Sequence, residues 1–162
     1  MGRGVEQLGR TRTPKSSGPS SHFSLATTIR RDRHMILVVD DDHDLRESLR
    51  EILEAEGFET IGASNGKEAI ELLRRKDQPP PRVILLDIMM PVMTGRDVLE
   101  RLRRDAPFAT TPVVFMTAFR TLVKTDEKTH VLYKPFSIDH VLAAIRQGVL
   151  TSQPRASLER EE

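Results

Sequence analysis

Short apolar runs recur along the middle of the chain, and most of them end abruptly in a polar residue. Residues 35–39, 83–86, 113–116 and 131–133 hold only aliphatic, aromatic or methionine side chains. A continuous apolar run of this length is typical of a strand that is buried on both faces, as in a parallel sheet. Residues 58–63 form a further short run of more mixed character. The pattern therefore predicts five strands.

Between these runs, apolar residues recur every three or four positions, which is the spacing of one helix face. Asp44 is the predicted N-cap of the first helix and Gly57 its predicted end, while Ser137 is the predicted N-cap of the last. The alternation of strand and helix predicts a doubly wound α/β domain with a parallel sheet. The inward faces are expected to hold Leu45, Leu49, Ile52 and Leu53, then Ala69, Leu72 and Leu73, then Val98, Leu99 and Leu102, and finally Ile138, Leu142, Ile145 and Val149.

Composition separates the globular part from two polar ends. Residues 1–34 are rich in Ser, Thr, Gly, Pro and Arg and carry seven Lys or Arg against two acids, so we expect a disordered basic tail. An alternative is that these residues are an upstream stretch read as coding, with Met35 as the working start. Residues 151–162 are the predicted C-terminal tail, with a net charge of −1. Because the whole chain carries +1, residues 35–150 carry −3, which does not favour nucleic acid as a partner.

Residue usage excludes several other classes of protein. The chain has no Cys, so it has neither a disulfide framework nor a thiolate metal site. No apolar run approaches the roughly 20 residues that span a bilayer. We therefore expect a soluble cytoplasmic protein without a membrane partner.

Each of the four most apolar runs leads into a residue that is suited to phosphate chemistry. Because the carboxyl ends of parallel strands lie at one edge of a sheet, these side chains are expected to meet there. Three neighbouring carboxylates repel one another, and hard oxygen ligands suit Mg²⁺. In chain order the residues are Asp40, Asp41 and Asp42, then Asp87, then Thr117, and last Lys134.

The ordered set VVDDD, LDIMMPVMTG, MTA and YKPF resembles the receiver domain of two-component response regulators, over about residues 35–150. The resemblance implies a flavodoxin-like sheet in strand order 2-1-3-4-5. It implies that Asp87 is the phosphorylated nucleophile. It also implies that Mg²⁺ is held by Asp40, Asp41 and Asp87 with the backbone carbonyl of Met89.

The same resemblance assigns supporting roles around the phosphoryl group. Lys134 and Thr117 would contact phosphoryl oxygens, and the small Ala118 would leave room for their approach. The peptide bond between Lys134 and Pro135 would be cis, which is inexpensive only before proline.

Two positions depart from the family pattern. Lys134 follows Thr117 by only 17 positions, so the fourth helix is expected to be shortened to one or two turns. Val131 stands where the family usually has an aromatic switch residue, and Tyr133, on the same strand face, is the candidate substitute. We therefore expect a weak or non-standard switch.

The resulting hypothesis is a stand-alone receiver, since only 12 residues follow Leu150, too few for an output domain. It would take its phosphoryl group from a histidine kinase or histidine phosphotransfer protein, catalyse only its own phosphorylation and dephosphorylation, and signal to an unknown protein by direct contact. One alternative is a receiver-like adaptor that works without phosphorylation. Another is a haloacid-dehalogenase-like phosphatase. Two features oppose that second alternative: Asp44 stands where Thr or Val is expected, and no acidic pair follows Lys134 on another strand.

Overall fold

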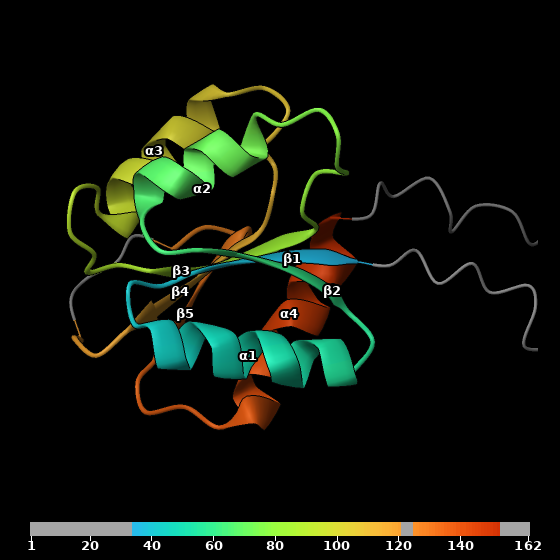
Figure 1. Ribbon diagram of the computed structural model, residues 1–162, viewed down its shortest axis with the longest axis vertical. Coiled ribbons are helices and arrows are strands. Elements are labelled where there is room, and N and C mark those ends of the chain that lie inside the picture. Colours follow the sequence, from blue (N-terminus) through green and yellow to red (C-terminus); the bar gives the residue numbers. More distant parts are fainter. Residues whose placement is uncertain (1–33, 121–124, 153–162) are drawn as a thin grey trace, which may run out of the picture. The chain divides into compact units, whose positions relative to one another are not determined.

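The computed structural model describes residues 34–120 and 125–152 (Figure 1). Most of the two predicted tails lies outside the described residues. The strands are β1 (Met35–Val39), β2 (Glu59–Ala63), β3 (Val83–Asp87), β4 (Val113–Thr117) and β5 (Thr129–Tyr133). The helices are α1 (His43–Ala55), α2 (Gly66–Leu73), α3 (Gly95–Arg104) and α4 (Ile138–Ser152).

The five strands form one parallel sheet in the order β2-β1-β3-β4-β5, which confirms the predicted fold class and strand order. In this order β1 lies beside β3, and Val39 pairs with Leu86. The residues that follow this pair, Asp40 and Asp87, therefore leave the sheet side by side. The fold thus creates the acidic edge from two segments that lie far apart in the sequence.

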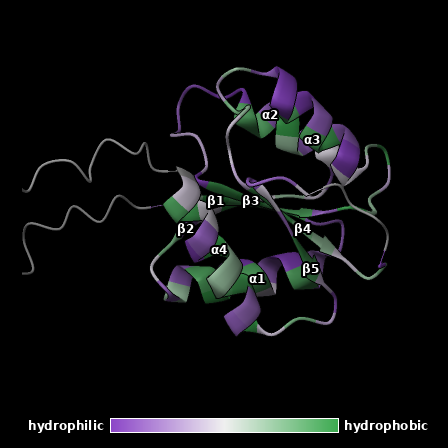
Figure 2. Cartoon of the chain, turned by 180° about the vertical axis from the view of Figure 1, so that it is seen from behind, coloured by the Kyte–Doolittle hydropathy of each residue, from purple (hydrophilic) through white to green (hydrophobic). Residues whose placement is uncertain are grey.

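Helices cover both faces of the sheet, with α1 and α4 on one side and α2 and α3 on the other (Figure 1). Alternate strand residues point to opposite faces. Ile36, Val38 and Leu85 pack in the core beneath α1 and α4, whereas Leu37 and Leu86 pack beneath α2 and α3. Figure 2 shows the strands as predominantly hydrophobic and the outer surfaces of α2 and α3 as hydrophilic.

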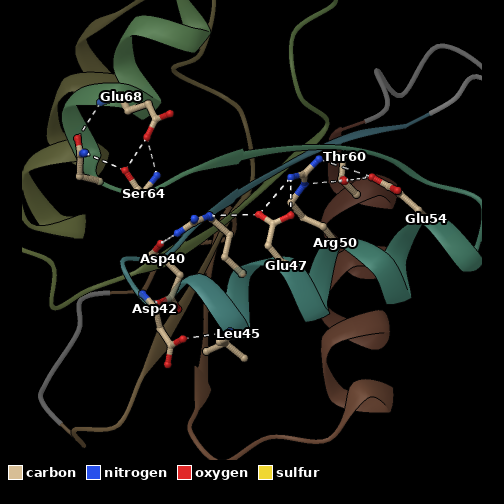
Figure 3. Close-up of polar contacts among 11 residues, drawn as sticks. Asp40, Asp42, Leu45, Glu47, Arg50, Glu54, Thr60, Ser64 and Glu68 are labelled. Atoms are coloured by element: carbon tan, nitrogen blue, oxygen red, sulfur yellow. Dashed lines mark hydrogen bonds and ion pairs between the residues drawn. The ribbon is translucent and has the colours of Figure 1, made fainter.

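The start of α1 differs from the sequence prediction. Its N-cap is Asp42, whose Oδ1 accepts a hydrogen bond from the backbone N–H of Leu45 at 3.1 Å, and Asp44 lies in the first turn (Figure 3). Asp42 is the N-cap because its backbone is still extended where the chain leaves β1, and an N-cap residue requires this non-helical conformation. Ile52, expected to face inward, is 40% exposed. Gly57 follows the helix with a φ of 92°, as expected for a glycine that ends a helix.

The connection from β4 to β5 is short. Residues 118–120 and 125–128 form bends, turns and coil, without an α-helix among them. A helix of one or two turns was predicted within this connection, but none is present in residues 118–120 and 125–128, and residues 121–124 lie outside the described residues.

Among the described residues, no helix is both long enough and apolar enough to cross a membrane.

Candidate functional site

Three carboxylates meet at the C-terminal edge of β1 and β3. Asp40 and Asp87 are buried, with exposed fractions of 0% and 5%, while Asp41 is exposed. One oxygen from each of the three lies within 4.8 Å of the others. Asp42 serves instead as the cap of α1. The structure therefore brings together the three acidic residues predicted to bind metal and separates the fourth acid from them.

Lys134 reaches this acidic cluster from the end of β5. Its Nζ donates to Asp40 Oδ2 at 2.8 Å and to Asp87 Oδ1 at 3.1 Å. The backbone N–H of Lys134 donates to the carbonyl oxygen of Thr117 at 2.7 Å, so the ends of β4 and β5 are joined at the site. The Lys134–Pro135 peptide bond is cis, as the family resemblance implies, and Pro135 itself is exposed.

Burial and mutual charge perturb both ends of this ion pair. Burial raises the pKa of Asp87, the hydrogen bond and charge of Lys134 offset part of this effect, and the charges of Asp40 and Asp41 raise the pKa further. Burial lowers the pKa of Lys134, but its interactions with Asp40 and Asp87 outweigh burial, so its pKa is raised overall. Lys134 therefore stays charged and serves as the counterion of the two buried acids.

Backbone contacts fix the orientation of Asp40. Its Oδ1 accepts from the N–H of Asp42 at 2.9 Å, and its own N–H donates to the carbonyl of Ala63 at 3.2 Å. The Arg46 guanidinium donates to the Asp40 carbonyl oxygen at 2.7 Å. Sequence reasoning did not identify Arg46, because nothing in the spacing of α1 distinguishes an arginine that folds back from one that faces solvent.

The loop after Asp87 folds back tightly against the strand end. Gly95 donates its N–H to the carbonyl of Ile88 at 2.9 Å, and a Cβ at Gly95 would lie 2.3 Å from the Asp87 carbonyl oxygen. Only glycine permits that approach. Val92 has a φ of 71°, and the Met93 N–H donates to the Pro91 carbonyl across it. Pro91 and Gly95 are residue types that commonly form such bends, whereas the left-handed backbone of Val92, a β-branched residue, has no signal in the sequence.

Thr117 lies at the end of β4 and is almost fully buried. Its hydroxyl accepts from the N–H of Phe119 at 3.1 Å and donates to the Phe119 carbonyl oxygen at 3.4 Å. The hydroxyl thus belongs to a local turn in this structure. Ala118, the next residue, is exposed beside it.

The two candidate switch residues differ in environment. Val131 is partly buried against the core beneath α2 and α3. Tyr133 is 43% exposed, and its ring lies 5.5 Å from the guanidinium carbon of Arg120. The aromatic side chain therefore sits at the surface beside a cation.

The donor set is suited to a divalent cation. Three carboxylates offer hard oxygen ligands, and the exposure of Asp41 leaves one side of the cluster open to water, which Mg²⁺ retains as a ligand. The Met89 side chain is 60% exposed, and its carbonyl follows Asp87 by two residues. The acidic cluster can thus hold a metal ion.

Comparisons with known proteins agree with this geometry. Residues 36–146 match the response regulator receiver domain. The chain is 37% identical over 131 residues to the DNA-binding response regulator MtrA of Mycolicibacterium smegmatis, covering 80% of this chain and 53% of that protein. It is 34% identical over 136 residues to the transcriptional regulatory protein KdpE of Mycobacterium tuberculosis, covering 78% and 55%. The chain therefore spans about half the length of these curated relatives.

Solved structures share the fold as well as part of the sequence. The chemotaxis response regulator CheY4 of Vibrio cholerae is 27% identical, with a TM-score of 0.62, over 71% of this chain and 98% of that chain. The receiver domain of the Francisella response regulator 1452 is 29% identical, with a TM-score of 0.63, over 74% and 99%. The chain belongs to the response regulator receiver domain family.

Proposed function

We propose that this chain is a phosphoacceptor that takes a phosphoryl group onto Asp87 from a histidine kinase or a histidine phosphotransfer protein. The observation that supports this most strongly is the convergence of Asp40, Asp41, Asp87 and Lys134 from three strands onto one edge of the sheet. This arrangement concentrates negative charge where a nucleophile, a metal and a phosphoryl group have to meet.

In the proposed reaction, an Asp87 carboxylate oxygen attacks phosphorus. The new oxygen–phosphorus bond forms as the bond between phosphorus and the donor's imidazole nitrogen breaks, and that nitrogen keeps the electron pair. The charge and hydrogen bond of Lys134 favour the ionised form of Asp87 before the reaction, and the same ammonium can then donate its hydrogen bond to a phosphoryl oxygen.

The carboxylates of Asp40, Asp41 and Asp87, with the carbonyl of Met89, would hold Mg²⁺. When bound, Mg²⁺ supplies positive charge that offsets the charge of the phosphoryl group. Before metal and donor arrive, Lys134 offsets only one of the three carboxylate charges, so the site keeps a net negative charge that favours a cation.

We assign Thr117 to a second phosphoryl oxygen. Its hydroxyl would have to exchange the Phe119 backbone for that oxygen, which couples phosphorylation to the turn after β4. The small Ala118 leaves room for the phosphoryl group to approach.

Because Val131 is aliphatic and Tyr133 lies at the surface, the switch is non-standard. Comparing partner binding of wild type and Tyr133→Phe tests this role. Equal binding in both phosphorylation states would rule out a role for the hydroxyl.

The signal would pass by contact with a downstream protein in the cytoplasm. The curated relatives are named as DNA-binding or transcriptional regulators, and this chain matches about half of their length. The match therefore supports the receiver chemistry in particular.

Intact mass after incubation with acetyl phosphate and Mg²⁺ tests the proposed function. Wild type should gain one labile phosphoryl group, while Asp87→Asn, or wild type with excess chelator, should gain none. A folded wild type that binds Mg²⁺ but gains no mass would instead support the adaptor that works without phosphorylation.

A further inference from the structure

A hollow of about 440 Å³ opens beside the phosphoacceptor, on the α3 side of the sheet edge. It lies between the loop that follows β3, the start of α3 and the end of β4. Its walls are Ile88, Met89, Thr94, Arg96, Thr117 and Phe119.

The walls of this hollow are mainly apolar and reach solvent. Met89 and Phe119 are 60% and 57% exposed, although neither lies on an outward helix face where a large apolar side chain is commonplace. Exposed apolar side chains that gather around one hollow mark a binding site more often than isolated ones do.

The polar groups of the hollow are largely engaged with the protein itself. The Thr94 hydroxyl donates to Asp97 in the capping box of α3, and the Thr117 hydroxyl is held by the Phe119 backbone. Arg96 is exposed and makes no hydrogen bond or ion pair within the described part of the chain. The hollow therefore offers apolar walls with one available cation, which suits a ligand that is apolar at one end and anionic at the other.

The hollow is continuous with the site of phosphoryl transfer. Ile88 and Met89 directly follow Asp87, and Thr117 belongs to both the hollow and the proposed phosphoryl site. A group attached to a phosphorus atom at Asp87 is consequently within a few bond lengths of these walls.

We infer that the hollow binds the apolar body of the phosphoryl donor. The site then prefers donors whose phosphoryl group is joined to an aromatic-sized apolar group over donors of acetyl size. This inference rests on the proposed function and adds a determinant of donor specificity. Phe119 is the one aromatic side chain among these walls, and it is 57% exposed.

Benzoyl phosphate and acetyl phosphate test the inference. Both are acyl phosphates, but the first carries an apolar phenyl group where the second carries a methyl group. In each case the oxygen–phosphorus bond to Asp87 forms, the bond between phosphorus and the acyl oxygen breaks, and benzoate or acetate leaves with the electron pair. The measured quantity is the ratio of the two second-order labelling rates, with Mg²⁺ present. Comparing this ratio between variants cancels the intrinsic reactivity of each donor. It also cancels any loss of labelling rate that a substitution causes with both donors.

Phe119→Ser should lower the ratio of benzoyl to acetyl phosphate labelling by about fivefold relative to wild type. Phe119→Leu should restore most of it, since it keeps an apolar side chain. Leu150→Ser is the matched control, because Leu150 is 72% exposed on α4, on the other side of the sheet. Its ratio should equal that of wild type.

Two results separate failure of the inference from failure of the proposed function. If both donors label the protein and the ratio of their labelling rates is the same in wild type and Phe119→Ser, the hollow does not bind the donor. The proposal that Asp87 is the phosphoacceptor would be unaffected by that result. A folded wild type labelled by neither donor would overturn both.

Discussion

At the scale of single residues, Lys134 is the counterion that allows two buried carboxylates to lie side by side in the folded protein. Two buried carboxylates side by side cost free energy, and the Lys134 ammonium lies within hydrogen-bonding distance of both. Its side chain is 24% exposed, so solvent weakens the attraction only in part. The lysine is therefore expected to support the fold as well as the reaction.

Lys134→Met should lower the free energy of unfolding by about 2–3 kcal/mol in the absence of Mg²⁺, because it leaves Asp40 and Asp87 without their counterion. The deficit should shrink at low pH, where Asp87, whose pKa is raised by burial, takes up a proton. Urea denaturation at several pH values measures both effects. Lys67→Met, which removes an exposed and loosely paired lysine on α2, is the control. Equal stability of the two variants would contradict the counterion role.

The residues beside the nucleophile also bear on how long the phosphorylated state lasts. Met89 and Phe119 are apolar and exposed next to Asp87 and Thr117, and neither can orient an attacking water. Hydrolysis of the aspartyl phosphate should therefore be slow. Met89→Asn, which introduces a hydrogen-bonding amide, should speed it several-fold. Loss of the phosphoryl group followed by intact mass measures the rate, and an unchanged rate in the variant would argue against this explanation.

At the scale of elements, the helix starts are fixed by short-range polar contacts. Glu68, in the first turn of α2, accepts hydrogen bonds from the backbone N–H and the hydroxyl of Ser64, both at 2.7 Å (Figure 3). These bonds hold the pKa of Glu68 below its ordinary value of about 4.5. The stabilisation is therefore present above that pH and is lost as the pH falls through the lowered pKa.

Glu68→Gln should lower the free energy of unfolding by about 1 kcal/mol at neutral pH, because a charged acceptor is replaced by a neutral one. The difference from wild type should disappear in acid, where Glu68 itself is protonated. Thermal unfolding of both proteins from pH 7 to pH 3 measures it. Glu71→Gln, on the exposed side of the same helix, should have little effect at any pH. A Glu68→Gln deficit that persists in acid would exclude the charge as its cause.

The sequence predicted the order and type of these elements better than their ends. The runs that became β1, β3 and β4 are buried on both faces, which leaves no polar position to shift their register, whereas the run in the edge strand β5 is only partly buried. The cap of α1 was predicted two residues too late, since Asp42 and Asp44 are chemically equal and only the backbone leaving β1 distinguishes them. The φ of Val92 has no sequence signal, because valine rarely adopts a left-handed conformation.

At the scale of the whole molecule, the sheet brings together groups as far apart in sequence as Asp40 and Lys134, which are 94 positions apart. The motifs predicted which acids and which lysine would meet, because parallel strands end at one edge. They could not predict Arg46 beneath Asp40, or the Thr117 hydroxyl held by its own turn. Those contacts depend on side-chain packing that neither spacing nor resemblance encodes.

Because the acidic cluster forms only in the folded chain, Mg²⁺ should stabilise the whole domain. At a free Mg²⁺ concentration about 100 times the Kd, the gain should be about 2.7 kcal/mol, and chelator should remove it. Asp41→Asn should abolish most of the gain with little effect on the metal-free fold, since Asp41 is exposed. Thermal unfolding with and without Mg²⁺ measures both. Glu51→Gln on α1 is the control, and an equal Mg²⁺ response in the Asp41 and Glu51 variants would place the ion elsewhere.

The residue that carries the phosphoryl group can be identified directly. An aspartyl phosphate is reduced by borohydride to homoserine, which marks its position permanently. Wild type would be labelled with acetyl phosphate and Mg²⁺, reduced, digested and mapped by peptide mass spectrometry. We predict homoserine at position 87 and none at positions 40 or 41. Homoserine at another acid, or none in a chain that had gained a phosphoryl group, would contradict the assignment of Asp87 as the phosphoacceptor.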